Sequence, residues 1–264
     1  MPEVIRRGLE YSAAAGSGPL LLDLYTPDGV ARPPLVVWLH GGGFVGGDRV
    51  NLPNTLWPGS IFGALTAAGF ACASVDYRLA PAARYPAPVQ DVRAALRFLR
   101  ERAPRYGYDA ERLGVWGESA GGLLALLAAL TDPQVRAVVA WYPATDILAL
   151  PLAPGDQDRE IALFGAPAKA VSELAAEASP ITYVTEAAPP ILLVHGDADA
   201  RVPISQSLRM HERLLDVGAD STLRVVPGAD HCFEHYTDVP GLINESVDFL
   251  STRLRGRAAT ELRN

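Results

Sequence analysis

The sequence is poor in lysine and cysteine, and it lacks a long apolar run. Lys169 is the only lysine, and 23 Lys and Arg residues stand against 30 Asp and Glu, which gives a formal net charge of -7. Nucleic-acid binding needs a basic surface, so this balance argues against such a partner. The longest apolar stretch, Gly121 to Leu130, is too short to span a bilayer. We therefore expect no nucleic-acid partner and no membrane span.

The two cysteines, Cys72 and Cys232, are far apart and make no disulfide framework, which leaves the redox compartment open. The first residues, MPEVIRRGLEYS, carry charges but no apolar leader segment. We therefore expect a cytoplasmic protein, and a secreted mature form stays compatible with the sequence.

Strand and helix patterns alternate along most of the 264 residues, which predicts one α/β domain over 1–264. Continuous apolar runs such as 34–39 and 70–75 are typical of strands buried on both faces. Residues 88–102 have apolar side chains at helical spacing, and 239–254 read as the last helix. Residues 1–33 read as an arm of two further strands. The alternation predicts a mostly parallel central sheet with helices on both faces.

The segment Gly117-Glu118-Ser119-Ala120-Gly121 lies between a predicted strand and a predicted helix and fits the pattern G-x-S-x-G. A serine at such a sharp turn is strained and exposed above the sheet, at a helix N-terminus that favours negative charge. We predict Ser119 as a nucleophile; the alternative is a serine that only caps the helix. Glu118 is expected to be an acid of the first helical turn.

A glycine-rich segment, His40-Gly41-Gly42-Gly43-Phe44, follows the predicted strand 34–39. Acyl transfer places negative charge on a carbonyl oxygen, and backbone amides can stabilise it where no Cβ intervenes. We predict an oxyanion hole formed by the amides of Gly42, Gly43 and Ala120. His40 is expected to hold this loop by hydrogen bonds.

A general base in this arrangement should follow the last strand, and among five histidines His231 does so. His235 is the second candidate. The acid should follow the predicted strand 191–194, where Asp197 and Asp199 both occur. Asp197 comes early enough in the turn to bond its own backbone, and Asp199 lies further out, so Asp199 is favoured. Its carboxylate would orient the imidazole and stabilise its charged form.

Five motifs carry a resemblance: HGGGF, VDYRLAP (75–81), YPAPVQD (85–91), GESAGG and HGDADARVP (195–203). Together they resemble the hormone-sensitive-lipase-like esterases, and they look closest to the BD-FAE-type α/β-hydrolases, near kynurenine formamidase. The resemblance covers roughly 35–233. It implies the α/β-hydrolase fold and a carboxylic ester hydrolase that needs no metal or cofactor. It also favours Asp199, because the family acid precedes the element matched here by Val202-Pro203.

Within VDYRLAP, the side chains of Asp76, Tyr77 and Arg78 are expected to be structural, as is Asp91: an Arg–carboxylate pair and a buried phenol would fix the loops under the site. Many lipase-like relatives have a long helical N-terminal cap, whereas residues 1–33 read as strands. We therefore predict a minimal cap, with 144–184 as a small lid-like insertion.

The apolar side chains expected to line the substrate pocket are Phe44, Trp141, Phe164 and Val202. The predicted function is hydrolysis of small to medium acyl or aryl esters through an acyl-enzyme. The expected partner is a small-molecule ester, and the sequence is compatible with a homodimer. Two alternatives stay open. One is an arylformamidase acting on an N-formylkynurenine-type amide, and the other is a non-catalytic ligand receptor on the same fold.

Overall fold

The computed structural model describes residues 3–14, 18–56, 60–151 and 156–255. Eight strands within these ranges form one sheet in the order β1-β2-β4-β3-β5-β6-β7-β8. Strands β1 and β2 join antiparallel, and all pairs from β4 onward to β8 are parallel. The predicted mostly parallel sheet is therefore confirmed. The strands are β1 (Glu3–Ala14), β2 (Gly18–Pro27), β3 (Pro34–Leu39), β4 (Ala71–Val75), β5 (Asp109–Glu118), β6 (Val135–Trp141), β7 (Ile191–Gly196) and β8 (Ser221–Val226).

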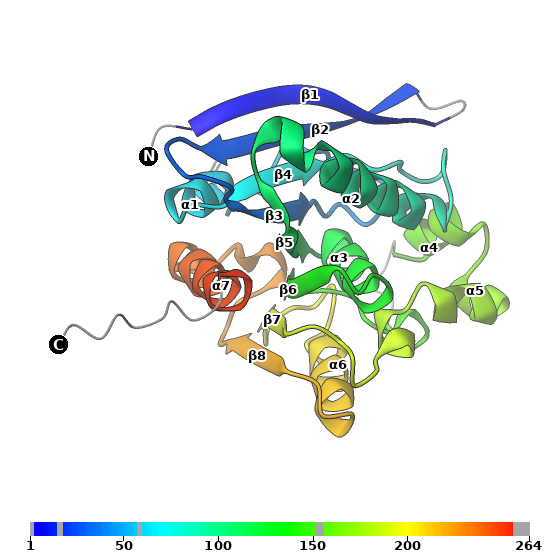
Figure 1. Ribbon diagram of the computed structural model, residues 1–264. Helices are drawn as coiled ribbons and strands as arrows, with labels where there is room; N and C mark the ends of the chain where they lie inside the picture. Colours follow the sequence, from blue (N-terminus) through cyan, green and yellow to red (C-terminus); the bar gives the residue numbers. More distant parts are fainter. Residues whose placement is uncertain (1–2, 15–17, 57–59, 152–155, 256–264) are drawn as a thin grey trace.

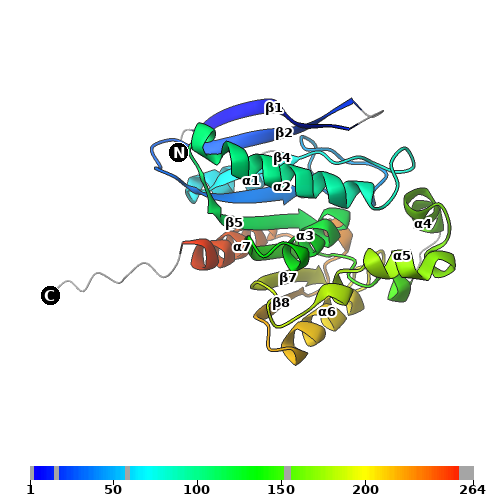
Figure 2. The same ribbon diagram turned by 45° about the vertical axis from the view of Figure 1, so that its right-hand side comes forward.

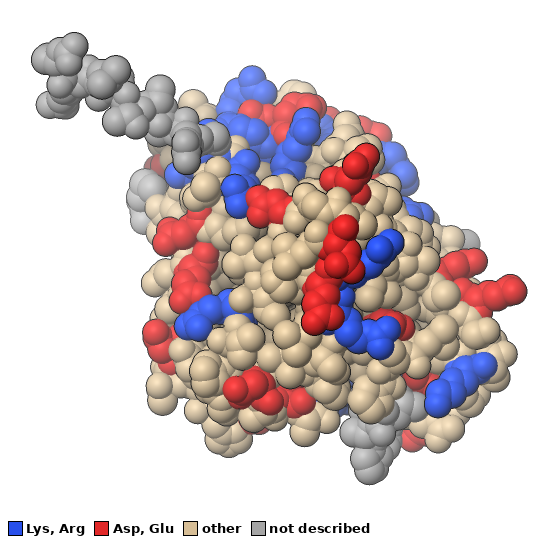
Figure 3. Space-filling model, turned by 90° about the horizontal axis from the view of Figure 1, so that it is seen from below, with Lys and Arg blue, Asp and Glu red and all other residues tan. Residues whose placement is uncertain are grey.

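Helices cover both faces of the sheet, with α1 and α7 on one side and α2, α3 and α6 on the other (Figure 1). Their bounds are α1 (Ser60–Ala67), α2 (Ala87–Tyr106), α3 (Ala120–Thr131), α4 (Asp156–Phe164), α5 (Ser172–Glu177), α6 (Ser205–Asp216) and α7 (Val239–Leu254). No helix of the described chain is long and apolar enough to cross a membrane. Acidic and basic side chains lie next to one another over much of the face seen from below (Figure 3).

Strand β3 shows how the two cores arise. Its six residues are all buried, and because successive side chains point to opposite faces, they divide between two clusters. Val36 and Trp38 pack with α1 and α7, whereas Leu35, Val37 and Leu39 pack with α2 and α3. A strand without a polar residue is the expected result of burial on both faces.

The segment between β6 and β7 holds the short helices α4 and α5 and three 3-10 turns: η1 (Ile147–Ala149), η2 (Ala168–Val171) and η3 (Pro180–Tyr183). Helices α4 and α5 stand apart from the main layers, beyond the end of the sheet to which β5 points (Figure 2). This is the region predicted as a lid-like insertion, and residues 152–155 of it lie outside the described residues. The segment covers the edge of the sheet at which the candidate site lies.

Candidate active site

Ser119 lies in the turn between β5 and α3 with φ +51° and ψ −118°, a conformation that is costly for a residue with a Cβ. The turn is possible because glycines flank it. A Cβ on Gly117 would lie 2.1 Å from the carbonyl oxygen of Gly121, and a Cβ on Gly121 would lie 2.1 Å from that of Leu39. The Ser119 amide donates to the carbonyl of Trp141 at 2.9 Å. Close packing therefore holds the serine in its strained conformation.

The structure brings Ser119, His231 and Asp199 together from three strand ends. The Ser119 Oγ lies 3.1 Å from Nε2 of His231, and Nδ1 of His231 lies 2.7 Å from Oδ2 of Asp199. A carboxylate only accepts hydrogen bonds, so Nδ1 is the donor, and in the neutral ring Nε2 is then free to accept the serine proton. The three side chains form one relay of hydrogen bonds.

Asp199 is buried, and its surroundings favour the charged form. Burial alone would raise the pKa of this carboxyl, but hydrogen bonds from His195 and His231 outweigh it and hold the pKa well below its usual value. The backbone amides of Arg201 and Val202 also donate to its Oδ1, each at 2.9 Å. An ionised carboxylate held by these hydrogen bonds can orient the imidazole.

The competing candidates lie elsewhere. Asp197 does not bond its own turn, contrary to our expectation; its Oδ1 accepts from the Gly228 amide at 2.6 Å, outside the relay. His235 is exposed and pairs with Asp230.

The thiol of Cys232, beside His231, is not an alternative nucleophile, because burial and then the Glu118 carboxylate raise its pKa to about 12. Among the described residues, no group of three His, Cys, Asp or Glu side chains is arranged to hold a metal ion.

The glycine-rich loop after β3 adopts a backbone that favours glycine, with φ +103° at Gly42 and +61° at Gly43. The amides of Gly43 and Ala120 donate hydrogen bonds to no other residue of the described chain. The prediction that His40 holds the loop is confirmed: Nδ1 of this buried ring bonds the Gly41 carbonyl at 2.8 Å, and the ring stacks on Tyr77. The loop is fixed, and it leaves amides available beside Ser119.

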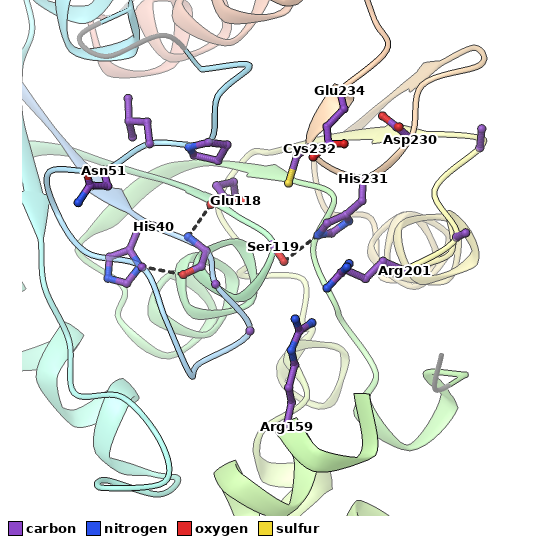
Figure 4. A pocket seen from close by; sticks show the side chains of 18 residues that line it. His40, Asn51, Glu118, Ser119, Arg159, Arg201, Asp230, His231, Cys232 and Glu234 are labelled. Carbon is purple, nitrogen blue, oxygen red and sulfur yellow. Dashed lines mark hydrogen bonds between the residues drawn. The ribbon is translucent and has the colours of Figure 1, made fainter. Parts of the chain in front are cut away.

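Glu118 differs from its expected place. It is the last residue of β5 and not a solvated acid of the helix, and its side chain is buried. Its Oε1 accepts from the Gly41 amide at 2.6 Å, which links the serine turn to the glycine loop (Figure 4). Burial raises the pKa of the Glu118 carboxyl, and the Gly41 hydrogen bond opposes that rise. Sequence spacing could not reveal this contact, because its partners are 77 positions apart.

The residues of the VDYRLAP motif are structural, as predicted. Arg78 forms a two-pronged ion pair with the carboxylate of Asp91, at 2.6 Å for Nη2 and 2.8 Å for Nε. The phenol of Tyr77 is buried and donates to the His40 carbonyl at 2.7 Å. Asp76 accepts from Arg49 at 2.7 Å. These contacts fix the loops beneath the glycine segment.

Two cavities meet at Ser119. The larger, about 540 Å³, has a wall of mixed polar and apolar surface, and its polar residues include His40, Asn51, Glu118, Asp230, His231 and Glu234 (Figure 4). The smaller, about 100 Å³, is apolar, and its wall includes Phe44, Ile147, Leu150, Leu163, Phe164 and Val202. His231 borders the larger cavity, and it is not part of the wall of the smaller one. The predicted pocket residues Phe44, Phe164 and Val202 thus gather in one place.

The predicted pocket role of Trp141 is wrong. This side chain is fully buried among the aromatic rings on the α7 side of the sheet, and its Nε1 donates to Ser246 at 3.0 Å. It lines neither cavity. The next residue, Tyr142, which the sequence did not single out, packs edge-on against the His231 ring, with the two ring centroids 4.8 Å apart.

The sheet order, the serine turn and the relay together define the α/β-hydrolase fold, and solved structures of that fold agree with it. The chain matches a truncated form of a carbohydrate esterase from gut microbiota with a TM-score of 0.82 and 28% identity, over 96% of each chain. A bifunctional GH43-CE protein of Bacteroides eggerthii matches with the same TM-score and 27% identity, over 95% of this chain and 35% of that one.

The chain belongs to the BD-FAE family, whose pattern it matches over residues 22–214. It is 32% identical to Esterase LipC and 30% identical to Esterase LipQ, both of Mycobacterium tuberculosis (strain ATCC 25618 / H37Rv). These alignments cover 81% and 87% of this chain but only 57% and 58% of the two relatives. The chain therefore spans less than two thirds of the length of these relatives, which are named esterases.

Proposed function

We propose that the protein is a serine carboxylic-ester hydrolase in which Ser119 is the nucleophile, His231 the general base and Asp199 the orienting acid. The observation that carries the proposal is the unbroken relay from the Ser119 hydroxyl through His231 to Asp199. The relay lies beside the amides of Gly43 and Ala120, which have no other partner within the described residues. The names of the relatives, esterase in each case, support the same reaction class.

In the first step, His231 removes the Ser119 proton as the oxygen attacks the ester carbonyl. The amides of Gly42, Gly43 and Ala120 would stabilise the resulting oxyanion, and each such donor typically contributes a few kcal/mol. His231 then protonates the departing alcohol, which leaves an acyl group on Ser119. Water, deprotonated by the same ring, attacks the acyl-enzyme and releases the acid.

We assign the two halves of the ester to the two cavities. His231 must reach the leaving oxygen, and of the two cavities it borders only the larger, whose wall carries charged and polar side chains, so we place the alcohol half there. The acyl half then enters the apolar cavity of about 100 Å³. A closed apolar cavity of about 150 Å³ accommodates benzene, so this one suits a short aliphatic acyl group. We propose short-chain acyl esters of a polar alcohol as the substrate class.

Replacement of Ser119 by alanine tests the proposal. Ser119→Ala should keep the fold and lower the turnover of 4-nitrophenyl acetate by at least about 10³-fold, because the relay then has no nucleophile. Ser12→Ala on the edge strand β1 is a matched control that should keep full activity. Retained hydrolysis by Ser119→Ala would refute the assignment of the nucleophile.

The alternatives have separate outcomes. A large preference of the wild-type protein for N-formylkynurenine over aryl acetates would favour the arylformamidase function, with the same relay acting on an amide. Tight binding of an ester without turnover, in a folded protein, would favour the receptor.

A further inference from the structure

Two arginines border the place where the cavities meet. Arg159, on α4, and Arg201, in the loop after β7, line both the larger and the smaller cavity. Their guanidinium groups point toward the space beside Ser119 from two different elements (Figure 4). Both side chains therefore border the space that a substrate in the two cavities would occupy.

Both arginines are placed close to Ser119, Arg159 by a contact of its side chain and Arg201 by a hydrogen bond of its backbone amide. A Cβ on Gly43 would lie only 3.0 Å from Cδ and 3.2 Å from Nε of Arg159, so this side chain lies directly against the oxyanion loop. The Arg201 amide donates to Asp199 at 2.9 Å, so its backbone is held by the relay itself. The side chain of Arg201 is exposed and forms no ion pair within the part of the chain that the structure describes.

Two of the three acidic residues of the larger cavity lie at another part of its wall, and the third, Glu118, is buried and accepts the Gly41 amide. Asp230 and Glu234 lie on the opposite side of His231 from Arg159 in Figure 4. Asp230 is engaged by His235 at 2.5 Å. Two cations thus border the meeting point, and Glu160, in the wall of the smaller cavity, is engaged by the Ala168 amide at 3.0 Å. A planar guanidinium binds a carboxylate through two parallel hydrogen bonds, which makes two converging arginines a good anion site.

We propose that the natural ester carries an anionic group, a carboxylate in the simplest case, on its alcohol half, and that Arg159 and Arg201 bind it. We place the charge on the alcohol half because the cavity that takes the acyl half is small and its wall is mostly apolar. This specificity rests on the proposed esterase function. The arginines select the substrate and position its alcohol half, and they take no part in the proton transfers.

The test compares 3- and 4-carboxyphenyl acetate with the matching carboxamidophenyl acetates, which have nearly the same shape but no charge. The readout is the ratio of kcat/KM for the anionic ester to that for the neutral one, so that changes common to both esters cancel. Arg159→Gln and Arg201→Gln should each lower this ratio by about tenfold, mainly through KM, which is the size expected for one charge-assisted hydrogen bond. Arg213→Gln, on the exposed face of α6, is the control and should leave the ratio unchanged.

A salt titration of the wild-type protein gives a second readout that needs no variant. Raising the ionic strength from about 0.01 M to about 0.15 M shortens the Debye length from about 30 Å to about 8 Å. The ratio should therefore fall with added salt. A ratio that neither variant changes, or that salt does not change, would overturn the proposal. Absence of hydrolysis for every ester would instead refute the esterase function itself.

Discussion

Glu118 is the residue that joins the two halves of the candidate site. Its buried carboxylate accepts the Gly41 amide, so the turn that carries Ser119 and the loop that carries the oxyanion amides share one hydrogen bond of 2.6 Å. A buried amide that loses its acceptor costs about 1–3 kcal/mol. We therefore propose Glu118 as a positioning residue, which holds the Ser119 turn and the glycine loop at a fixed distance.

Two substitutions at Glu118 separate positioning from charge. Glu118→Gln keeps a carbonyl acceptor for Gly41 and should keep most of the esterase activity, whereas Glu118→Ala removes the acceptor and should lower kcat by about tenfold or more. The measurement is kcat and KM for 4-nitrophenyl acetate in both variants. Equal activity of Glu118→Ala and wild type would show that the loop does not need this contact.

The raised pKa of Glu118 also makes stability depend on pH. Burial favours the protonated form in the folded protein, so the folded state binds the proton more tightly than the unfolded chain. The corresponding stabilisation is complete below the unfolded pKa, about 4.3, and is lost as the pH rises through the higher folded value. Wild type should therefore lose this stabilisation as the pH rises above about 4.3, whereas Glu118→Gln has no proton to lose. The free energy of unfolding of Glu118→Gln, minus that of wild type, should increase over this pH range. A difference that is constant with pH would contradict the assignment.

At the scale of elements, the site depends on how closely α3 approaches β3. The start of this helix lies against the end of the strand, and a Cβ on Gly121 would meet the carbonyl oxygens of Leu39 and His40 at 2.1 and 2.3 Å. These are backbone atoms, which cannot move aside as a side chain can. The helix therefore needs glycine at this point to bring its N-terminus to the oxyanion loop.

A pair of glycine substitutions tests this packing. Gly121→Ala should destabilise the fold by at least about 1–3 kcal/mol, the usual cost of overpacking, and should abolish ester hydrolysis. Gly63, on α1, has open space where a Cβ would lie, so Gly63→Ala should stabilise the protein by about 0.5–1 kcal/mol. Chemical denaturation measures both changes. A neutral effect of Gly121→Ala would mean that the helix and the strand approach each other less closely than these distances require.

The elements also show what the sequence could and could not predict. Strand β3 and helix α7 begin and end at the predicted residues, because continuous apolar residues and a proline mark them. Helix α1 was not predicted: its eight residues are too few to establish a helical period. The prediction that Trp141 lines the pocket is wrong, although the alternation along β6 indicates its true place. Trp141 is two residues after Val139 and four after Ala137, so its side chain points to the same face of the sheet, toward α7.

Contacts between loops that are far apart in the sequence could not be predicted from sequence patterns. The relay was predictable because each member follows a strand of a parallel sheet, and such strands end at the same edge. The link from Glu118 to Gly41 and the approach of Arg159 to Gly43 depend instead on where loops cross in space. No local spacing encodes these contacts.

At the scale of the whole molecule, the segment between β6 and β7 forms one wall of the apolar cavity. Phe164, at the end of α4, and Leu163 both line it. The cavity lies between this segment and the oxyanion loop, so the size of its side chains limits the acyl group. We therefore propose that the lid-like segment sets the acyl preference, whereas the strand ends of the sheet position the relay.

Phe164→Ala should enlarge the apolar cavity and shift the preferred acyl length of 4-nitrophenyl esters from two to four carbons toward about six or more, since the ring leaves space for several methylenes. Phe98→Ala, a half-buried ring on α2 that lines neither cavity, is a control that should keep the original preference. An unchanged chain-length profile for Phe164→Ala would place the acyl group elsewhere.

The most direct test of the account is covalent labelling with a fluorophosphonate, which reacts with a serine only where a base activates it. We predict one adduct per chain by intact-mass measurement, located by peptide mapping on Ser119, absent from Ser119→Ala and formed far more slowly in His231→Ala. A folded wild-type protein that stays unlabelled, or an adduct on another residue, would contradict the central claim that Ser119, His231 and Asp199 act as one nucleophilic relay.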